Sequence, residues 1–193
     1  MNFNELNKPI VFVVDMINGF AKEGALADKR IMEIVPDMQD LLNCVESRVF
    51  ICDSHPENAR EFMAYPQHCL EGSVESEVLD ELKPYVNGLV VMKNSTNAFF
   101  APTMQEFIKN DLDKYNDFVI VGCCSDICVL TFALCLQTYF NEHQMLDKRI
   151  IVGKNMIETY HIDGVHDANY WNEVACSIMA SNGIVVENVK RVS

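Results

Sequence analysis

The sequence predicts an α/β fold: a single doubly wound domain over residues 1–193, with a six-stranded, mainly parallel sheet and helices on both faces. Two observations lead to this prediction. Short apolar runs rich in Val and Ile are continuous rather than alternating, which is typical of strands covered on both faces. Segments of helical character lie between these runs, and this alternation is typical of a parallel sheet. No repeat, low-complexity segment or linker divides the chain.

The predicted elements follow one another in regular order. The apolar runs predict strands over residues 9–15, 48–53, 88–93, 117–122, 148–154 and 183–189. The segments between them predict helices over residues 30–46, 74–84, 102–113, 126–142 and 167–182. In the first of these helices the apolar side chains recur at helical spacing and so share one face. They are Ile31, Ile34, Met38, Leu41, Leu42 and Val45.

Composition narrows the class of protein. Of the 193 residues, 49% are hydrophobic, which is enough to bury a substantial core and argues against disorder. The net charge of -13 argues against nucleic acid and anionic membranes as partners, because both bind basic surfaces. No apolar run approaches the roughly 18 residues of a membrane span, and the N-terminus lacks a signal-peptide pattern. We therefore expect a cytoplasmic protein whose eight cysteines are reduced thiols rather than a disulfide framework.

Chemically active residues follow four of the predicted strands. Asp15 ends the first, DSHP (53–56) follows the second, Lys93 ends the third, and CCSDIC (123–128) follows the fourth. Ligands of such sheets bind beyond the carboxyl ends of the strands. The sequence therefore predicts a site where these groups converge.

The cysteine cluster predicts a nucleophile. Ser125 and Asp126 are good N-cap residues, so Cys128 falls in the first helical turn, where the dipole and a nearby Lys93 ammonium favour a thiolate. Asp15 is placed to exchange a proton with it, and N–H groups near Cys124 and Cys128 are placed to hold an oxyanion. The alternative is that these cysteines are small buried hydrophobic residues, which is the better interpretation for Cys123 and Cys124 and stays open for Cys128.

A candidate metal site follows the second strand. Asp53 and His55 are joined by Glu61 and His68 in the next stretch of the chain. Two imidazoles and two carboxylates suit one divalent Zn²⁺, Mn²⁺ or Fe²⁺ ion better than Ca²⁺. The alternative is a polar loop with two ordinary histidines. The remaining histidines, at positions 143, 161 and 166, are interpreted as surface or loop residues.

Taken together, these motifs resemble those of the isochorismatase-like cysteine hydrolases, and most closely the nicotinamidases. The resemblance rests on VVDMINGF (13–20), VVMKNSTNAFF (90–100), GCCSDICV (122–129) and the D-x-H…P-x-H-C pattern of residues 53–69. It implies that Asp15, Lys93 and Cys128 are catalytic. It also implies a cis peptide between Cys123 and Cys124, with the N–H groups of Cys124 and Cys128 forming the oxyanion hole.

The loop motif departs from the nicotinamidase pattern in three places. Ser54 replaces a Trp, Glu61 stands where a His is common, and Tyr65 replaces another Trp. The resemblance still implies a metal held by Asp53, His55, Glu61 and His68, and it implies a ring pocket. The aromatic walls of that pocket are Phe20, Tyr65 and Phe99.

These observations predict an amidohydrolase that converts nicotinamide to nicotinate and ammonia through a cysteine thioester. One alternative is a cysteine hydrolase of the same family that acts on another small amide or ureido compound. Another is a non-catalytic binding or redox-responsive protein on the same fold. The resemblance also implies a homo-oligomer.

Overall fold

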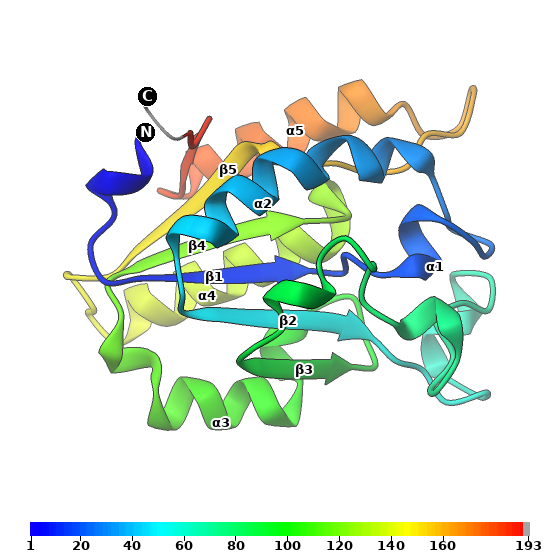
Figure 1. The fold of residues 1–193 in the computed structure, drawn as a ribbon, viewed down its shortest axis with the longest axis horizontal. Helices are drawn as coiled ribbons and strands as arrows, with labels where there is room; N and C mark the ends of the chain where they lie inside the picture. The colour runs from blue at the N-terminus through cyan, green and yellow to red at the C-terminus, as the bar shows by residue number, and fades with distance from the viewer. Residues whose placement is uncertain (191–193) are drawn as a thin grey trace.

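The computed structural model of the protein describes residues 1–190, so residues 191–193 at the end of the predicted domain lie outside it. One six-stranded sheet forms its centre, and every paired strand is parallel (Figure 1). The strands lie in the order β3-β2-β1-β4-β5-β6. Their bounds are β1 Pro9–Val14, β2 Arg48–Asp53, β3 Leu89–Lys93, β4 Asp117–Gly122, β5 Arg149–Ile157 and β6 Val185–Glu187. The predicted fold class is confirmed.

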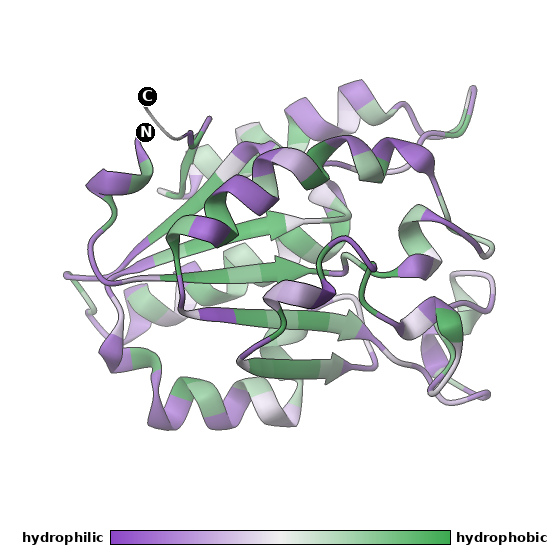
Figure 2. Ribbon diagram, viewed as in Figure 1, coloured by the Kyte–Doolittle hydropathy of each residue, from purple (hydrophilic) through white to green (hydrophobic). Residues whose placement is uncertain are grey.

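The central strands are buried on both faces, which explains their continuous apolar sequences. In β1, Ile10, Phe12 and Val14 belong to one core, whereas Val11 and Val13 belong to the other. The strands form the most hydrophobic part of the molecule (Figure 2). Burying apolar side chains on both sides gives this sheet its main stabilisation.

Helices cover the two faces unequally. Apolar side chains of α3 (Pro102–Asn110), α4 (Leu130–Glu142) and α5 (Ala168–Ser181) pack into the first core. The second core is covered by α2 (Val35–Cys44), with irregular segments around it. A short helix, α1 (Asn18–Ala21), follows β1.

The prediction of a helix over residues 74–84 is wrong. That stretch forms two 3₁₀ turns, Val74–Ser76 and Lys83–Tyr85. Its backbone is engaged with the segment after β1 instead of with itself: the Asn18 N–H donates to the Glu77 carbonyl, and the Leu79 N–H donates to the Met16 carbonyl. Tertiary hydrogen bonds have overridden the local helical pattern.

Two other predicted helices begin later than expected. The first is a 3₁₀ helix over Lys29–Ile34 before α2, whose first turn contains Pro36. The helix predicted from residue 126 opens with a π turn, Ser125–Val129, and becomes α-helical at Leu130. Ser125 does not cap it, because its hydroxyl donates to Asn172 Oδ1.

The strand order brings β1 beside β4, at the point where successive connections turn to opposite sides of the sheet. In this topology the crevice beyond the strand ends is the favoured place for a ligand. The fit there is close: a Cβ added to Gly122 would lie 2.0 Å from the Val14 carbonyl oxygen. Gly122 also has a φ of +119°, a conformation that side chains with a Cβ rarely adopt.

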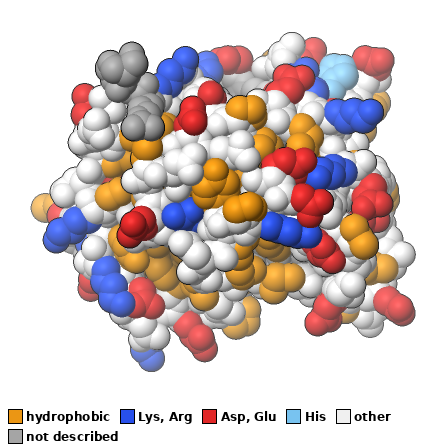
Figure 3. Space-filling model, viewed as in Figure 1, with side chains coloured by type: hydrophobic (Ala, Val, Ile, Leu, Met, Phe, Trp, Pro, Cys, Tyr) orange, Lys and Arg blue, Asp and Glu red, His pale blue; other side chains and the backbone are white. Residues whose placement is uncertain are grey.

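On the surface, acidic and basic side chains are spread over the viewed face, and hydrophobic side chains gather in its lower half (Figure 3). Among the described residues, no helix combines the length and the apolar character needed to cross a membrane.

Candidate active site

The predicted catalytic residues meet at the carboxyl edge of the sheet. Lys93, the last residue of β3, lies 2.8 Å from Asp15 Oδ2 and 3.8 Å from Cys128 Sγ, measured from its Nζ. It also forms an ion pair with Asp53 at the end of β2. Asp15 comes directly after β1, with a φ of 50° that is uncommon for a residue other than glycine. Its Oδ1 accepts a hydrogen bond from the Asp53 N–H, at 3.0 Å.

The two carboxyls of this cluster have opposite pKa shifts. Burial and the neighbouring Asp53 charge raise the pKa of Asp15 to about 7, although the Lys93 ammonium opposes them. Burial alone would also raise the pKa of Asp53, but Lys93 and the two nearby imidazoles hold it well below its usual range. The pKa of Lys93 is raised because both carboxyls outweigh its burial. Asp15 is therefore the carboxyl suited to gain and release a proton near neutral pH.

The helix position and Lys93 favour a thiolate at Cys128, whereas burial favours the neutral thiol. Burial raises the pKa of its thiol well above the usual range, and the Lys93 ammonium only partly opposes this. The residue is 4% exposed, and its Sγ shares an enclosure with the Asp15 and Asp53 carboxylates. Asp15 Oδ2 forms an ion pair with Lys93 but accepts no hydrogen bond of good geometry, so it keeps a lone pair for the thiol proton. Proton transfer to Asp15 must therefore precede any attack by the sulfur.

The turn that carries Cys128 presents free backbone donors. The Cys124 carbonyl accepts from the N–H groups of Ile127 and Val129, at 3.2 and 3.0 Å. Within residues 1–190, the N–H group of Cys124 donates to no backbone carbonyl outside the helices and strands, and the Cys128 N–H lies in the first turn of the helix. The Cys123–Cys124 peptide is cis, as the resemblance implies. Cys123 is fully buried, and its thiol donates to the Asp15 carbonyl at 3.1 Å.

A polar network that was not predicted from the sequence connects this turn to α5, to the end of β5 and to the segment before α2. The Ser125 hydroxyl donates to Asn172 Oδ1 at 2.5 Å, and Asn172 Nδ2 donates to Glu158 Oε1 at 2.5 Å. The Ser125 N–H donates to the Glu158 carbonyl, and Arg30 pairs with the Glu158 carboxylate at 3.2 Å. Asn172 lies on α5 and Arg30 precedes α2. Their distance along the chain is why no local motif marks them.

The predicted metal-site residues also come together. Asp53, His55, Glu61 and His68 each offer a ligand atom, and these atoms lie within 4.8 Å of one another. Three of the four are buried, and Glu61 is half-buried. Glu61 Oε2 accepts from the Thr96 N–H at 2.9 Å, which fixes its carboxylate.

The imidazoles are oriented as metal ligands are. Nδ1 of His55 lies 2.8 Å from Asn94 Oδ1, and Nδ1 of His68 lies 2.8 Å from the Pro66 carbonyl. Both partners accept, so Nδ1 carries the proton and Nε2 keeps its lone pair in the neutral ring. Each Nε2 faces Asp53 Oδ2, at 3.6 and 3.7 Å, which is too long for a hydrogen bond. The His55 Nε2 is buried without a hydrogen-bond partner. This donor set fits a divalent transition-metal ion.

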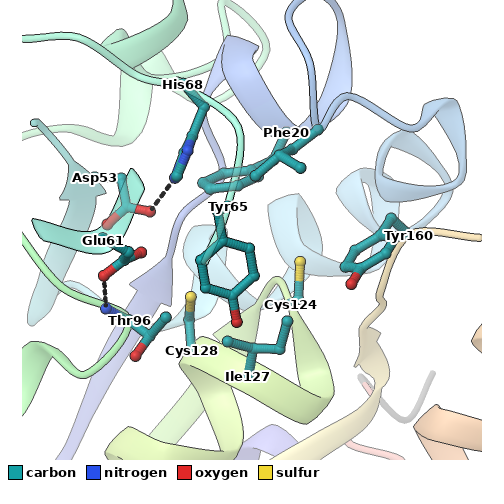
Figure 4. A pocket seen from close by; sticks show the side chains of 11 residues that line it. Phe20, Asp53, Glu61, Tyr65, His68, Thr96, Cys124, Ile127, Cys128 and Tyr160 are labelled. Atoms are coloured by element: carbon teal, nitrogen blue, oxygen red, sulfur yellow. Dashed lines mark hydrogen bonds and ion pairs between the residues drawn. The ribbon is translucent and has the colours of Figure 1, made fainter. Parts of the chain in front are cut away.

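A cavity connects the two groups, with about 320 Å³ of space between its lining atoms when the part open to solvent is included. Figure 4 shows the carboxylates and His68 on one side, Tyr160 on the other and Tyr65 between them. Both Cys124 and Cys128 line the cavity. So do Phe20 and Tyr65, as predicted, together with residues that were not predicted. These are Leu26, Thr96, Ile127 and Tyr160.

The prediction that Phe99 forms a wall of the pocket is wrong. Phe99 does not line this cavity. Its ring packs against Phe100 and Tyr139, with centroids 5.6 and 5.7 Å away. Asn97 caps the short 3₁₀ turn that carries it by accepting from the Phe99 N–H, and this turn directs the ring toward α4. Tyr160, after β5, supplies a wall that no motif indicated.

Comparison with known proteins places this geometry in a family. The model of the isochorismatase domain matches residues 9–145. The chain belongs to the isochorismatase family. It is thus an isochorismatase-like hydrolase, and Cys128 lies within the matched region. A comparison with curated protein sequences gives no significant match.

Solved structures share the fold at low sequence identity. A nicotinamidase/pyrazinamidase from Acinetobacter baumanii is 23% identical, with a TM-score of 0.78 over 95% of this chain and 97% of that one. A zinc-containing pyrazinamidase from Pyrococcus horikoshii is 19% identical, with a TM-score of 0.75 over 94% and 99%. An N-carbamoylsarcosine amidase from Thermoplasma acidophilum is 24% identical, with a TM-score of 0.69 over 95% and 96%.

Proposed function

We propose that this isochorismatase-like hydrolase converts nicotinamide to nicotinate and ammonia. One observation carries the proposal. Cys128 is in contact with Lys93 and shares a buried enclosure with Asp15 at one end of a cavity with aromatic walls, beside a cluster of metal-ligand type. A flat heteroaromatic ring suits the walls, and its carboxamide suits the nucleophile.

The reaction begins with the buried pair. Asp15 takes the proton of Cys128, and the sulfur attacks the carboxamide carbon to form a C–S bond. The oxygen gains negative charge, which the N–H groups of Cys124 and Cys128 stabilise. Asp15 then gives its proton to the amide nitrogen, the C–N bond breaks, and ammonia leaves.

Hydrolysis of the thioester completes the cycle. Asp15 removes a proton from water, which attacks the thioester carbon. The C–S bond breaks, Asp15 returns the proton to the departing Cys128 sulfur, and the nicotinic acid that is formed releases its own proton to solvent to give nicotinate. Lys93 stabilises the transient thiolate and holds the Asp15 carboxylate in place, since it contacts both.

The cluster beside the cavity orients the ring. A divalent ion of the Zn²⁺, Mn²⁺ or Fe²⁺ type, held by Asp53, His55, Glu61 and His68, would supply a Lewis-acid contact for a pyridine nitrogen. Phe20 and Tyr65 limit the ring to one plane from the sides. The amide then reaches Cys128 in one orientation.

A second candidate is another small amide or ureido substrate. The Thermoplasma acidophilum amidase of the same fold bears such a substrate in its name. The loop after β2 also departs from the nicotinamidase pattern at Ser54, Glu61 and Tyr65. No observation favours the third alternative, a non-catalytic binding or redox-responsive protein.

Ammonia release from nicotinamide by the metal-reconstituted protein tests the proposal. We expect sustained turnover that is lost in Cys128→Ala. A parallel assay with N-carbamoyl amino acids and simple aromatic amides identifies the second candidate. Turnover of those compounds without turnover of nicotinamide would replace the proposed substrate, and no turnover of any of them would refute the hydrolytic assignment.

A further inference from the structure

The loop after β5 gives the cavity one of its walls. Tyr160 lines the cavity, and its ring stacks on His166 with centroids 4.1 Å apart and planes at 17°. Trp171 of α5 also stacks with His166, with centroids 5.6 Å apart and planes at 9°. Ile162 and His166 pair across the loop, which closes it. His166 lies in a loop, which is one of the two positions expected for it, but it is only 8% exposed.

Both ring nitrogens of His166 face acceptors. Nδ1 lies 2.8 Å from the Tyr160 carbonyl oxygen, and Nε2 lies 2.9 Å from Asp126 Oδ2. Neutral imidazole has one N–H, so only the imidazolium can donate both hydrogen bonds. The aromatic rings of Tyr160 and Trp171, both nearly parallel to this imidazole, suit a cationic ring. A positively charged imidazole would satisfy both acceptors at once.

Asp126 gives this charge a partner at the nucleophile turn. It lies in the same π turn as Cys128. Its side chain is 8% exposed, and His166 is its only ion-pair partner among residues 1–190. Its Oδ1 is buried without a hydrogen-bond partner. The imidazolium is thus the bridge between the loop that carries Tyr160 and the turn that carries the sulfur.

We propose that His166 is a positioning residue whose charged ring fixes the Tyr160 wall to the Cys128 turn. When the imidazolium loses its proton, one nitrogen becomes an acceptor facing an acceptor, and that hydrogen bond is lost. The wall then loosens, the cavity opens, and a ring-shaped ligand binds more weakly. The ligand in this inference rests on the proposed function, whereas the bridge itself does not.

The other titratable groups of the surrounding elements have separate partners. His161, on the same loop, lies 3.0 Å from Asp163. Asp167 caps α5 by accepting from the Tyr170 N–H. The pKa of Tyr160 is raised to about 12 by burial, so its phenol stays neutral. Asp126 is the carboxylate that faces His166.

Trp171 makes the bridge measurable without a substrate. It is the only tryptophan of the chain, and imidazolium quenches indole fluorescence more strongly than neutral imidazole does. We expect the fluorescence of the intact protein to rise through one transition as His166 loses its proton. The transition should be absent in His166→Gln and present in His161→Gln, the matched control on the same loop. In Asp126→Asn it should move to lower pH, because the carboxylate that favours the charged ring is gone.

Alkylation by iodoacetamide tests the link to the cavity, again without a substrate. At a pH where His166 is charged, we expect Cys128 to be alkylated faster in His166→Gln than in wild type and in His161→Gln. With nicotinamide, His166→Gln should raise KM about three- to tenfold and change kcat little, as for loss of aromatic contact. A wild-type protein without nicotinamide turnover would refute the proposed substrate alone, since fluorescence and alkylation still test the bridge.

Three results would overturn the inference. The first is a fluorescence transition that persists in His166→Gln, and the second is one that does not move in Asp126→Asn. The third is an alkylation rate in His166→Gln equal to that of wild type. If His166→Gln fails to fold, the inference is tested by the pH of the fluorescence transition in Asp126→Asn compared with wild type.

Discussion

Lys93 shows how much a single buried residue carries in this protein. Its side chain is 1% exposed, and it neutralises Asp15 and Asp53, which are equally hidden from water. Removing one partner of a buried ion pair destabilises the folded state strongly, because the other charge stays buried without compensation. The lysine is therefore as necessary to the fold as to the chemistry.

Replacing Lys93 with Met keeps the length of the side chain and removes the ammonium. Two buried carboxylates are then left facing each other, so we expect the free energy of unfolding to fall by about 3–5 kcal/mol. Denaturant titration measures this. Lys114→Met is the control, because that ammonium pairs with Asp111 on the surface. A loss no larger than that of the control would contradict the assignment of Lys93 as the neutralising group.

Cys128 is the residue on which hydrolysis depends. Cys128→Ala should abolish ammonia release and leave the circular dichroism and melting temperature close to wild type, since the thiol makes few polar contacts. Cys123→Ala should keep much of the activity, because Cys123 is fully buried and does not line the cavity. Near wild-type turnover in Cys128→Ala would rule out the sulfur as nucleophile.

The π turn Ser125–Val129 depends on elements that lie elsewhere in the sequence. Asn172→Ala would leave the Ser125 hydroxyl without its acceptor and would remove one of the donors to the Glu158 carboxylate, which keeps its pair with Arg30. We expect a stability loss of about 1–3 kcal/mol. We also expect kcat to fall more than KM rises, because the turn carries the nucleophile. Glu173→Ala on the same helix is the control, since its pair with Lys154 is exposed. A fall in kcat no greater than in the control would show that the turn is held without Asn172.

The loop between β2 and β3 holds the metal-type ligands. His55→Ala or His68→Ala should lose bound metal, measured by elemental analysis after reconstitution with Zn²⁺, Mn²⁺ or Fe²⁺. Nicotinamide hydrolysis should fall mainly through KM, since the ion would bind the ring. Cys128 should stay open to alkylation. His143→Ala, at the exposed end of α4, should keep metal and activity. Less than about a tenth of an ion per wild-type chain would contradict the site.

Elements whose hydrophobic pattern agrees with their tertiary role were predictable. The central strands are continuous and apolar because both of their faces are covered, and α3 and α5 keep a simple periodic pattern. The segment 74–84 has the same pattern, but its backbone groups bond to residues near α1 instead. A single sequence does not reveal such competition. The π turn was missed for a similar reason. Ser125 has the sequence character of a helix N-cap, but its hydroxyl donates to Asn172 on α5 instead of capping the turn.

In the site, the predictable residues are those at or directly after the end of a strand. Asp15, Asp53 and Lys93 are in that position, and the carboxyl ends of parallel strands meet at one edge. The prediction that Phe99 lines the pocket was wrong because the 3₁₀ turn capped by Asn97 directs its ring toward α4. Tyr160 and His166 were missed because the residues that hold their loop in place, Asp126 and Trp171, lie on other elements. Their only signal in the sequence is that aromatic residues surround His166.

The assembly of whole molecules is also testable. We expect a homo-oligomer, with a mass in solution of at least two 21.9 kDa chains. Val90 and Met92 on the edge strand β3 are 37% and 47% exposed, which is unusual for large apolar side chains on a strand. Light scattering coupled to size exclusion measures the mass, and a monomer at micromolar concentration would contradict this expectation.

The central position of β1 sets the order in which function can arise when the chain is made. Its neighbours are β2, close in sequence, and β4, whose Asp117 pairs with Pro9. A growing chain on the ribosome holds Asp15, Asp53 and Lys93 before the sulfur of residue 128 has been synthesised. Such a nascent chain carries the three charged side chains that are buried in the folded protein but lacks the nucleophilic sulfur. When the complete chain refolds after dilution from denaturant, activity still requires β2 and β4 to pair on the two sides of β1, so recovery of enzymatic activity should lag behind the recovery of secondary structure.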